Sequence, residues 1–134
     1  PWWVEDEACF FITICALPRG SNSLCHPELG QSLWESVCHR QALNQWNVPL
    51  FLLMPDHLHM LARFAPSVAM ATTVTAWKRY TARQIGLSWQ RDFFDHRIRN
   101  VDAFEEKAHY IRMNPVRADF VDVPDDLPYL WGDF

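Results

Sequence analysis

The feature that most narrows the possible folds of this chain is residues 48–64, where two apolar runs flank a Pro-Asp pair. The runs are VPLFLLM and HLHMLARF, and Pro55-Asp56 between them is typical of a tight turn. Short apolar runs of this kind predict strands that pack into a core. We therefore expect a β-hairpin of residues 48–54 and 57–64.

Three further segments have patterns typical of regular structure. Residues 9–17, CFFITICAL, are rich in β-branched and aromatic residues, which predicts a buried strand. Apolar residues recur at helical spacing from Pro27 to Trp46, so a helix is expected there. Residues 68–86 predict a second helix, and Gly86 is a typical residue to end it.

The C-terminal part of the chain predicts a third helix and little else. Asp102 and Glu105 resemble a capping box at its start, and Asn114-Pro115 should end it. The tail after this helix should be mostly loop with one short strand. Alternating strands and helices favour a single α+β domain over residues 1–134, with an antiparallel sheet and helices packed on one face.

Composition excludes several classes of protein. The longest apolar runs are far shorter than the roughly 20 residues that a membrane span needs, so no membrane partner is expected. The N-terminus, PWWVEDEACF, is acidic where a secretion signal would be basic. The four cysteines form no C-x-x-C pair, which predicts reduced, mostly buried thiols and a cytoplasmic protein.

Charge is distributed unevenly, although the chain as a whole carries a net charge of −4. Residues 77–117 hold nine of the twelve basic residues and five acids, which gives +4 and leaves −8 for the remainder. A half that faces phosphate and a solvated half would produce this asymmetry, and so would ordinary helix-surface charges beside an acidic tail. Both interpretations remain open on charge alone.

His57 and His59 are separated by one residue in a predicted strand. Side chains alternate across a strand, so the two imidazoles share one face and Leu58 occupies the other. Neighbours on one face lie roughly 7 Å apart, close enough to bind one ion together. Two half-buried histidines that bond to backbone or water are the alternative.

The third predicted helix offers possible partners for that histidine pair. Tyr110 and Asn114 are spaced i, i+4, so they lie on one helix face about 6 Å apart along the axis. The amide oxygen of Asn114 is a hard ligand, compatible with Mg²⁺ or Mn²⁺. A tyrosine can act as a nucleophile if a cation activates its electrophile. Ordinary packing of Tyr110, with Asn114 ending the helix, is the alternative.

Four motifs follow one another along the chain, namely FFITICAL, LMPDHLHML, WQRDFFDHRIRN and YIRMNPVRADFV. In this order they resemble the HUH single-tyrosine transposases of the insertion-sequence-200 type, and most closely their REP-associated branch. The resemblance implies a ferredoxin-like sheet of the HUH endonuclease type. It also implies a divalent Mg²⁺ or Mn²⁺ ion held by His57, His59 and Asn114. Asn114 is typical of the REP-associated branch, where insertion-sequence members usually have Gln.

The same resemblance implies an enzyme that nicks and transfers single-stranded DNA. Tyr110 would attack a phosphodiester and form a 5′-phosphotyrosine intermediate, which is the reaction of a transposase, and the implied target is hairpin-forming repetitive DNA. Tyr80 is a competing nucleophile, but no metal-type ligand follows it at i+4. Two other functions remain open, a domesticated module that binds DNA hairpins without catalysis and a metal-dependent phosphohydrolase that uses water. A homodimer and a monomer both fit.

Basic residues in the second half of the chain are the candidates for contact with DNA. We expect them to form a surface beside the site, with Trp77 or Trp89 stacking on an unpaired base. Packing in the core is the alternative for both tryptophans. The expected DNA-binding residues are Lys78, Arg79, Arg83, Arg97, Arg99, Arg112 and Arg117.

Overall fold

The predicted helices and strands are all present in the structure, with shifts at their ends. The computed structural model describes residues 8–118 and 128–132, apart from the side chains of residues 116 and 117. In chain order its elements are β1 (Ala8–Cys15), α2 (Pro27–Ala42), β2 (Asn47–Met54), β3 (His57–Phe64), α3 (Met70–Ile85), β4 (Phe94–Ile98), α4 (Val101–Arg117) and β5 (Leu130–Gly132).

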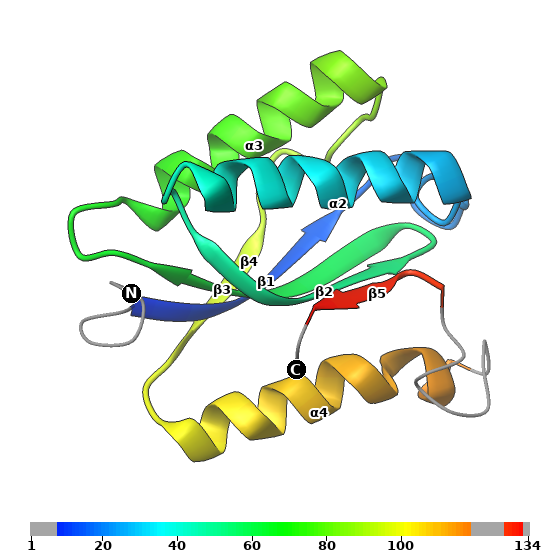
Figure 1. The fold of residues 1–134 in the computed structure, drawn as a ribbon. Helices are drawn as coiled ribbons and strands as arrows, with labels where there is room; N and C mark the ends of the chain where they lie inside the picture. The colour runs from blue at the N-terminus through cyan, green and yellow to red at the C-terminus, as the bar shows by residue number, and fades with distance from the viewer. Residues whose placement is uncertain (1–7, 119–127, 133–134) are drawn as a thin grey trace.

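The strands form one antiparallel sheet in the order β4-β1-β3-β2-β5 (Figure 1). The elements from β1 to β4 follow the βαββαβ order of a ferredoxin-like fold, and β5 extends the sheet beside β2. Met54 pairs with His57, so Pro55-Asp56 is the hairpin turn. The structure thus confirms the α+β class, the antiparallel sheet and the hairpin.

The helices lie on both faces of the sheet, and the expectation of one covered face was wrong. Helices α2 and α3 cover one face, while α4 lies across the other (Figure 1). Two buried clusters match this arrangement. Leu33 of α2 and Trp77 of α3 belong to the first cluster, and Ile111 of α4 belongs to the second.

The central strands explain why both faces need cover. In β2, Phe51 and Leu53 belong to the cluster under α2 and α3, whereas Leu50 and Leu52 belong to the cluster under α4. All four side chains are fully buried. A strand that is apolar on both faces leaves apolar area in water unless a layer packs on each side. The third helix therefore takes the face that the first two leave open.

Strand β4 was not predicted from the sequence. Its residues, FDHRI, show no run of apolar side chains, and only Ile98 is buried. The strand exists because its backbone pairs with β1, from Cys9 opposite Ile98 to Thr13 opposite Phe94. Pairing of this kind depends on a distant strand and leaves little trace in local composition.

The ends of α4 also differ from the prediction. Asn100 caps its start, because the Asn100 Oδ1 accepts a hydrogen bond of 2.8 Å from the backbone N–H of Ala103. The expected capping box at Asp102 and Glu105 was therefore placed two residues too late. The helix also continues through Pro115 to Arg117. Proline removes one N–H from the ladder, but Ala118 N still donates to Asn114 O at 3.1 Å.

The cysteines are free, as predicted, but they are less buried than expected. Cys9 is buried, Cys15 and Cys25 are half-buried, and Cys38 is exposed. Burial raises the pKa of the Cys25 thiol to about 11. Within residues 8–118 and 128–132, no helix combines the length and apolar character that crossing a membrane requires.

Ile111→Ala should test the packing of α4 on the second face. Ile111 is fully buried in the cluster under α4. The substitution leaves a cavity and should lower the free energy of unfolding by about 2–5 kcal/mol. Urea denaturation measures the change. Val101→Ala is the control, because Val101 begins the same helix and is 70% exposed. Equal destabilisation by both variants would contradict this packing.

Candidate active site

His57 and His59 lie on the face of the sheet that α4 covers. Their side chains point to the face opposite that of Leu58, which belongs to the cluster under α2 and α3. Leu61, two residues after His59, belongs to the cluster under α4. The two imidazole rings lie 4.9 Å apart between centroids. The predicted same-face arrangement is thus present, and the rings lie side by side at the start of β3.

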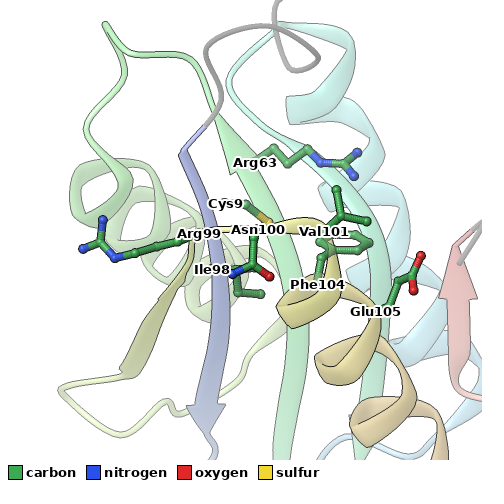
Figure 2. Close-up of a pocket in the computed structure, with 8 residues that line it drawn as sticks. All are labelled: Cys9, Arg63, Ile98, Arg99, Asn100, Val101, Phe104 and Glu105. Carbon is green, nitrogen blue, oxygen red and sulfur yellow. The ribbon is translucent and has the colours of Figure 1, made fainter.

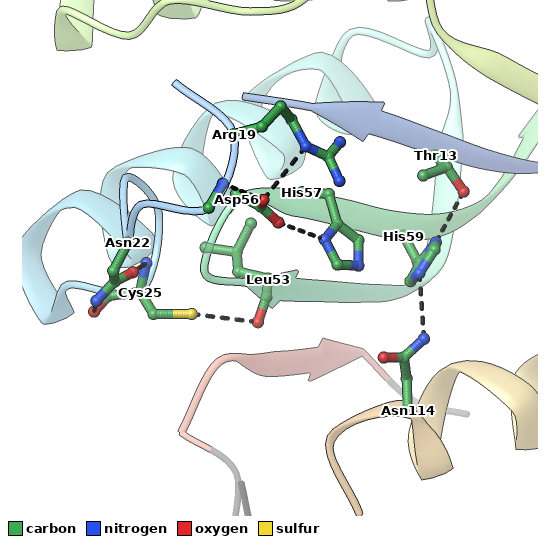
Figure 3. Close-up of polar contacts among 10 residues, drawn as sticks. Thr13, Arg19, Asn22, Cys25, Leu53, Asp56, His57, His59 and Asn114 are labelled. Carbon is green, nitrogen blue, oxygen red and sulfur yellow. Dashed lines mark hydrogen bonds and ion pairs between the residues drawn. The ribbon is translucent and has the colours of Figure 1, made fainter. Parts of the chain in front are cut away.

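His59 links the sheet to α4 through hydrogen-bond contacts at both of its nitrogens (Figure 3). The Nδ1 atom lies 2.8 Å from the hydroxyl of Thr13, which is the residue opposite on β1. The Nε2 atom lies 3.3 Å from the side-chain nitrogen of Asn114 on α4. Phe11 stacks on the ring at 5.3 Å. These contacts fix the orientation of an imidazole that is only 7% exposed.

His57 is oriented by the carboxylate of Asp56 in the hairpin turn. The Nδ1 atom of His57 lies 2.9 Å from Asp56 Oδ1. The other carboxylate oxygen of Asp56 accepts a hydrogen bond of 2.8 Å from Gly20 N–H and lies 3.2 Å from Arg19 Nε (Figure 3). The bond to His57, then the Gly20 N–H and the Arg19 charge, lower the pKa of Asp56. The carboxylate is therefore ionised at neutral pH and holds the His57 ring by its Nδ1 edge.

Helix α4 brings Tyr110 and Asn114 to the same place. The Tyr110 ring lies 6.1 Å from the His59 ring and 5.9 Å from the Phe11 ring, between centroids. Asn114 follows one turn later and contacts His59. Tyr110 is 43% exposed, so part of this residue is open to solvent. Four residues that are separated by up to 57 positions, from His57 to Asn114, thus meet on one face.

The groups at this site could hold one cation through mixed nitrogen and oxygen donors. No three His, Cys, Asp or Glu side chains cluster in a metal-binding arrangement within the described part of the chain. A third protein ligand beside the two imidazoles must therefore come from another side-chain type, and the Asn114 amide is adjacent. Its oxygen and nitrogen exchange places by rotation of the amide group.

The competing tyrosine lies elsewhere. Tyr80 belongs to α3, which covers the opposite face of the sheet from α4 (Figure 1). It is 47% exposed and lies beside Arg40, whose guanidinium carbon is 5.9 Å from the ring centroid. Tyr80 therefore shares exposure with Tyr110 but not proximity to the histidines.

Lys78 is a structural residue, and its prediction as a DNA contact was wrong. It is only 8% exposed. Its Nζ atom donates to the backbone carbonyls of Gln90 at 2.8 Å and Arg91 at 2.9 Å. Burial lowers the pKa of this ammonium, and the charge of Asp92 opposes part of that shift. Lys78 thus ties α3 to the segment before β4.

The remaining basic residues do not form the expected surface beside the site. Arg79 and Arg83 are exposed on α3, across the sheet from Tyr110. Arg97 alternates with Ile98, whose side chain packs under α4, so Arg97 faces the α3 side. Arg112 is half-buried on α4, and the Arg117 side chain lies outside the described residues. Arg99 extends away from Phe104 in Figure 2.

Both candidate stacking tryptophans belong to the core. Trp77 is fully buried, and its Nε1–H donates to Ser36 Oγ at 2.8 Å. Trp89 packs on Trp77 at 5.7 Å and donates to Thr81 Oγ1 at 2.9 Å. The alternative interpretation, core packing, is therefore the correct one for both.

A cavity of about 390 Å³ lies at the N-terminal end of α4 (Figure 2). Its lining includes Cys9, Arg63 and Phe104, and the Arg63 guanidinium lies over the Phe104 ring at 4.8 Å. None of the residues that line it belongs to the His57, His59, Tyr110 and Asn114 group. The candidate site is therefore separate from this cavity.

Sequence reasoning missed the residues that orient the histidines. Thr13 is the one hydroxyl side chain in the apolar strand ACFFITIC, and this isolation was the available signal. Asp56 was assigned only to the turn, although it directly precedes His57. Phe11 carried no signal of its own, because its contact with the His59 ring depends on the pairing of β1 with β3.

In the absence of added metal, Asp56→Ala should lower the free energy of unfolding, because it removes the shared partner of His57, Gly20 and Arg19. The expected loss is about 1–3 kcal/mol at neutral pH, by urea denaturation. The pKa of Asp56 is lowered in the folded state, so its contribution is present above the ordinary value of 3.8 and disappears as pH falls through the folded value. Wild type and variant should therefore converge in acid. A difference that persists unchanged there would contradict the role of the charge.

Two solved structures share the fold. The structure described as the REP-associated tyrosine transposase bound to a REP hairpin matches with a TM-score of 0.81 and 22% identity, over 92% of this chain and 75% of that chain. A putative transposase from Deinococcus radiodurans R1 matches with a TM-score of 0.60 and 16% identity, over 78% of this chain and 88% of that chain. Identities this low establish the fold alone.

Sequence comparison identifies the family. A putative REP-associated tyrosine transposase of Haemophilus influenzae is 28% identical over 95 residues, which is 58% of this chain and 53% of the relative. The chain thus spans about half the length of that curated relative. The family model described as "Transposase IS200 like" matches residues 12–114, a range that includes the histidine pair, Tyr110 and Asn114. This chain therefore belongs to the IS200-like transposase family.

Proposed function

We propose that this protein is a metal-dependent transposase that nicks and joins single-stranded DNA through Tyr110. The observation that carries the proposal is the meeting of α4 with β3. There, Tyr110 lies 6.1 Å from the His59 ring, and Asn114 lies 3.3 Å from His59 Nε2. Membership in the IS200-like transposase family supports the same assignment.

His57, His59 and Asn114 would hold the ion. The Nδ1 atoms contact Asp56 and Thr13, so each ring directs its Nε2 edge away from these partners. A histidine ligand commonly hydrogen-bonds through its second nitrogen in this way. Imidazole nitrogens favour transition ions and an amide oxygen suits hard ions, so Mn²⁺ fits the mixed set better than Mg²⁺. A bound divalent cation would polarise the scissile phosphate.

Tyr110 supplies the nucleophile. Its phenolic oxygen forms a bond to phosphorus while the bond from phosphorus to the 3′ oxygen of the preceding nucleotide breaks. The phenolic proton passes through solvent to that oxygen, which leaves as a free 3′-OH. The DNA remains attached as a 5′-phosphotyrosine. A 3′-OH from another strand end can reverse the step and join the strands, so no nucleotide cofactor is required.

The substrate we propose is a DNA hairpin with unpaired flanks. One solved relative is described as bound to a REP hairpin, and the Haemophilus relative is named as REP-associated. The site of this chain is consistent with such a substrate, because Tyr110 is exposed beside β3 and lies outside the cavity at the start of α4. An extended strand can pass over an exposed site of this kind.

Tyr110→Phe should abolish the covalent adduct, because it removes only the attacking oxygen. Labelled hairpin oligonucleotides from the source genome, incubated with Mn²⁺, are separated on a denaturing gel and tested for protein-linked label. Tyr80→Phe is a matched control, because Tyr80 is 47% exposed, close to the 43% of Tyr110, and lies across the sheet from it. It should form the adduct at the wild-type level.

Each other outcome of this assay would indicate a different nucleophile or a different function. Labelling of Tyr110→Phe but not of Tyr80→Phe would place the nucleophile on α3. Cleavage by Tyr110→Phe without an adduct would indicate a phosphohydrolase that uses water. Binding of hairpins by the wild type without any cleavage would indicate a domesticated binding module.

His57→Ala should remove measurable Mn²⁺ binding, because only two protein ligands remain. Asp56→Asn keeps both rings but loses the charge that orients His57, and should weaken Mn²⁺ binding about 10- to 100-fold. Isothermal titration calorimetry measures both affinities. His39→Ala is the control, because His39 is exposed on α2 on the opposite face. Wild-type affinity in His57→Ala would exclude the histidine pair as the metal site.

A further inference from the structure

Phe94 is an exposed aromatic residue in the same cross-strand row as His59. Thr13 of β1 pairs with His59 on one side and with Phe94 of β4 on the other. Residues directly opposite each other share a face of the sheet, so Phe94 lies on the α4 side. Strands are about 4.8 Å apart, which places Phe94 about 10 Å from His59 across the row. Its side chain is 58% exposed.

Helix α4 leaves this part of the sheet uncovered. The helix contacts β2 and β3, and the residue of β4 that is buried in the cluster under α4 is Ile98, at the far end of the strand. Phe94 therefore contributes little to the core, and its ring meets Phe11 edge-on at 6.5 Å. Phe11 in turn contacts both His59 and Tyr110. The exposed ring is thus one aromatic neighbour away from the candidate nucleophile.

A positive charge lies beside the same row. The Lys107 Nζ atom is 5.2 Å from the Phe11 ring centroid and 5.7 Å from the Tyr110 ring centroid. Lys107 is half-buried one turn before Tyr110. Phe94 and Lys107 therefore both contact Phe11. An exposed aromatic ring with a positive charge close by matches the way proteins bind single-stranded nucleic acid.

We propose that Phe94 stacks on the base of a nucleotide next to the phosphate that Tyr110 attacks, and that Lys107 binds the phosphate of that nucleotide. The occupant is an unpaired nucleotide, because a base inside a duplex is already stacked on both faces by its neighbours. This inference rests on the proposed function for the identity of the attacked phosphate. The inference assigns base stacking to Phe94 instead of Trp77 and Trp89, which are in the core.

The base-stacking role is tested with two fluorescent strands that carry the same phosphates. One is oligo(dT) of 12 nucleotides, and the other is an abasic strand of equal length. Fluorescence anisotropy measures both affinities in the Tyr110→Phe background, which prevents the reaction. Phe94→Ala should weaken oligo(dT) binding roughly 5- to 100-fold and leave the abasic strand nearly unchanged. Phe94→Trp should retain the preference for oligo(dT).

Leu43→Ala is the matched control for Phe94→Ala. Leu43 is 55% exposed and follows α2 on the opposite face, so its loss should change neither affinity. Equal weakening of both strands by Phe94→Ala, or no weakening, would overturn base stacking. Light scattering gives a further check, since β4 is an edge strand. A wild-type dimer that Phe94→Ala converts to a monomer would assign the ring to contact between copies.

The phosphate contact is tested by the salt dependence of oligo(dT) binding. Lys107→Gln should reduce the slope of log affinity against log salt by about 0.7, the value for one phosphate contact on a single strand. Arg40→Gln is the control, because Arg40 lies beside Tyr80 as Lys107 lies beside Tyr110. An unchanged slope in Lys107→Gln would overturn the contact.

These binding results separate the inference from the proposed function. Loss of the oligo(dT) preference in Phe94→Ala, together with no adduct in any wild-type assay, would retain the nucleotide site and reject the transposase. An adduct formed normally by a protein whose Phe94→Ala variant keeps the oligo(dT) preference would retain the transposase and reject the site.

Discussion

Strand β3 and its neighbour β2 carry buried side chains on both faces, so water must be excluded from each side of the sheet. Helices α2 and α3 can cover only one side, and α4 must pack on the other. Phe104, Ala108 and Ile111 give α4 an apolar stripe for this purpose. Because the stripe fixes the rotation of the helix, it also fixes where Tyr110 and Asn114 lie. The position of the candidate chemistry is a consequence of core packing.

The histidines are held by contacts that belong to three separate elements. Thr13 of β1 contacts His59, Asp56 of the hairpin turn contacts His57, and Asn114 of α4 contacts His59 from the other side. Each ring is thereby restricted to one orientation before any ion or DNA binds. Preorganisation of this kind lowers the cost of binding, since little side-chain freedom remains to be lost.

Positive charge near the site comes from fewer residues than the number of basic residues in the second half of the chain suggested. Lys78 is buried against backbone carbonyls, and Arg79, Arg83 and Arg97 lie on or face the α3 side. On the α4 side, Lys107 and Arg112 remain on the helix that carries Tyr110. Although the net charge of the chain is −4, these two basic residues place positive charge on the helix of the candidate nucleophile. Stacking on Phe94 would supply affinity that charge alone does not.

Much of the fold and of the candidate site could be predicted from local sequence patterns. The hairpin, the three helices, the shared face of His57 and His59, and the spacing of Tyr110 and Asn114 all follow from periods of two and 3.6 residues. Strand β4 was not readable, because it forms by pairing with β1 and has almost no buried side chains. The face that α4 covers, the burial of Lys78 and Trp77, and the row of His59, Thr13 and Phe94 were equally hidden. Sequence period determines which side chains share a face of one element. Only the packing of elements against each other decides which faces meet, because that choice depends on excluding water from the whole sheet at once.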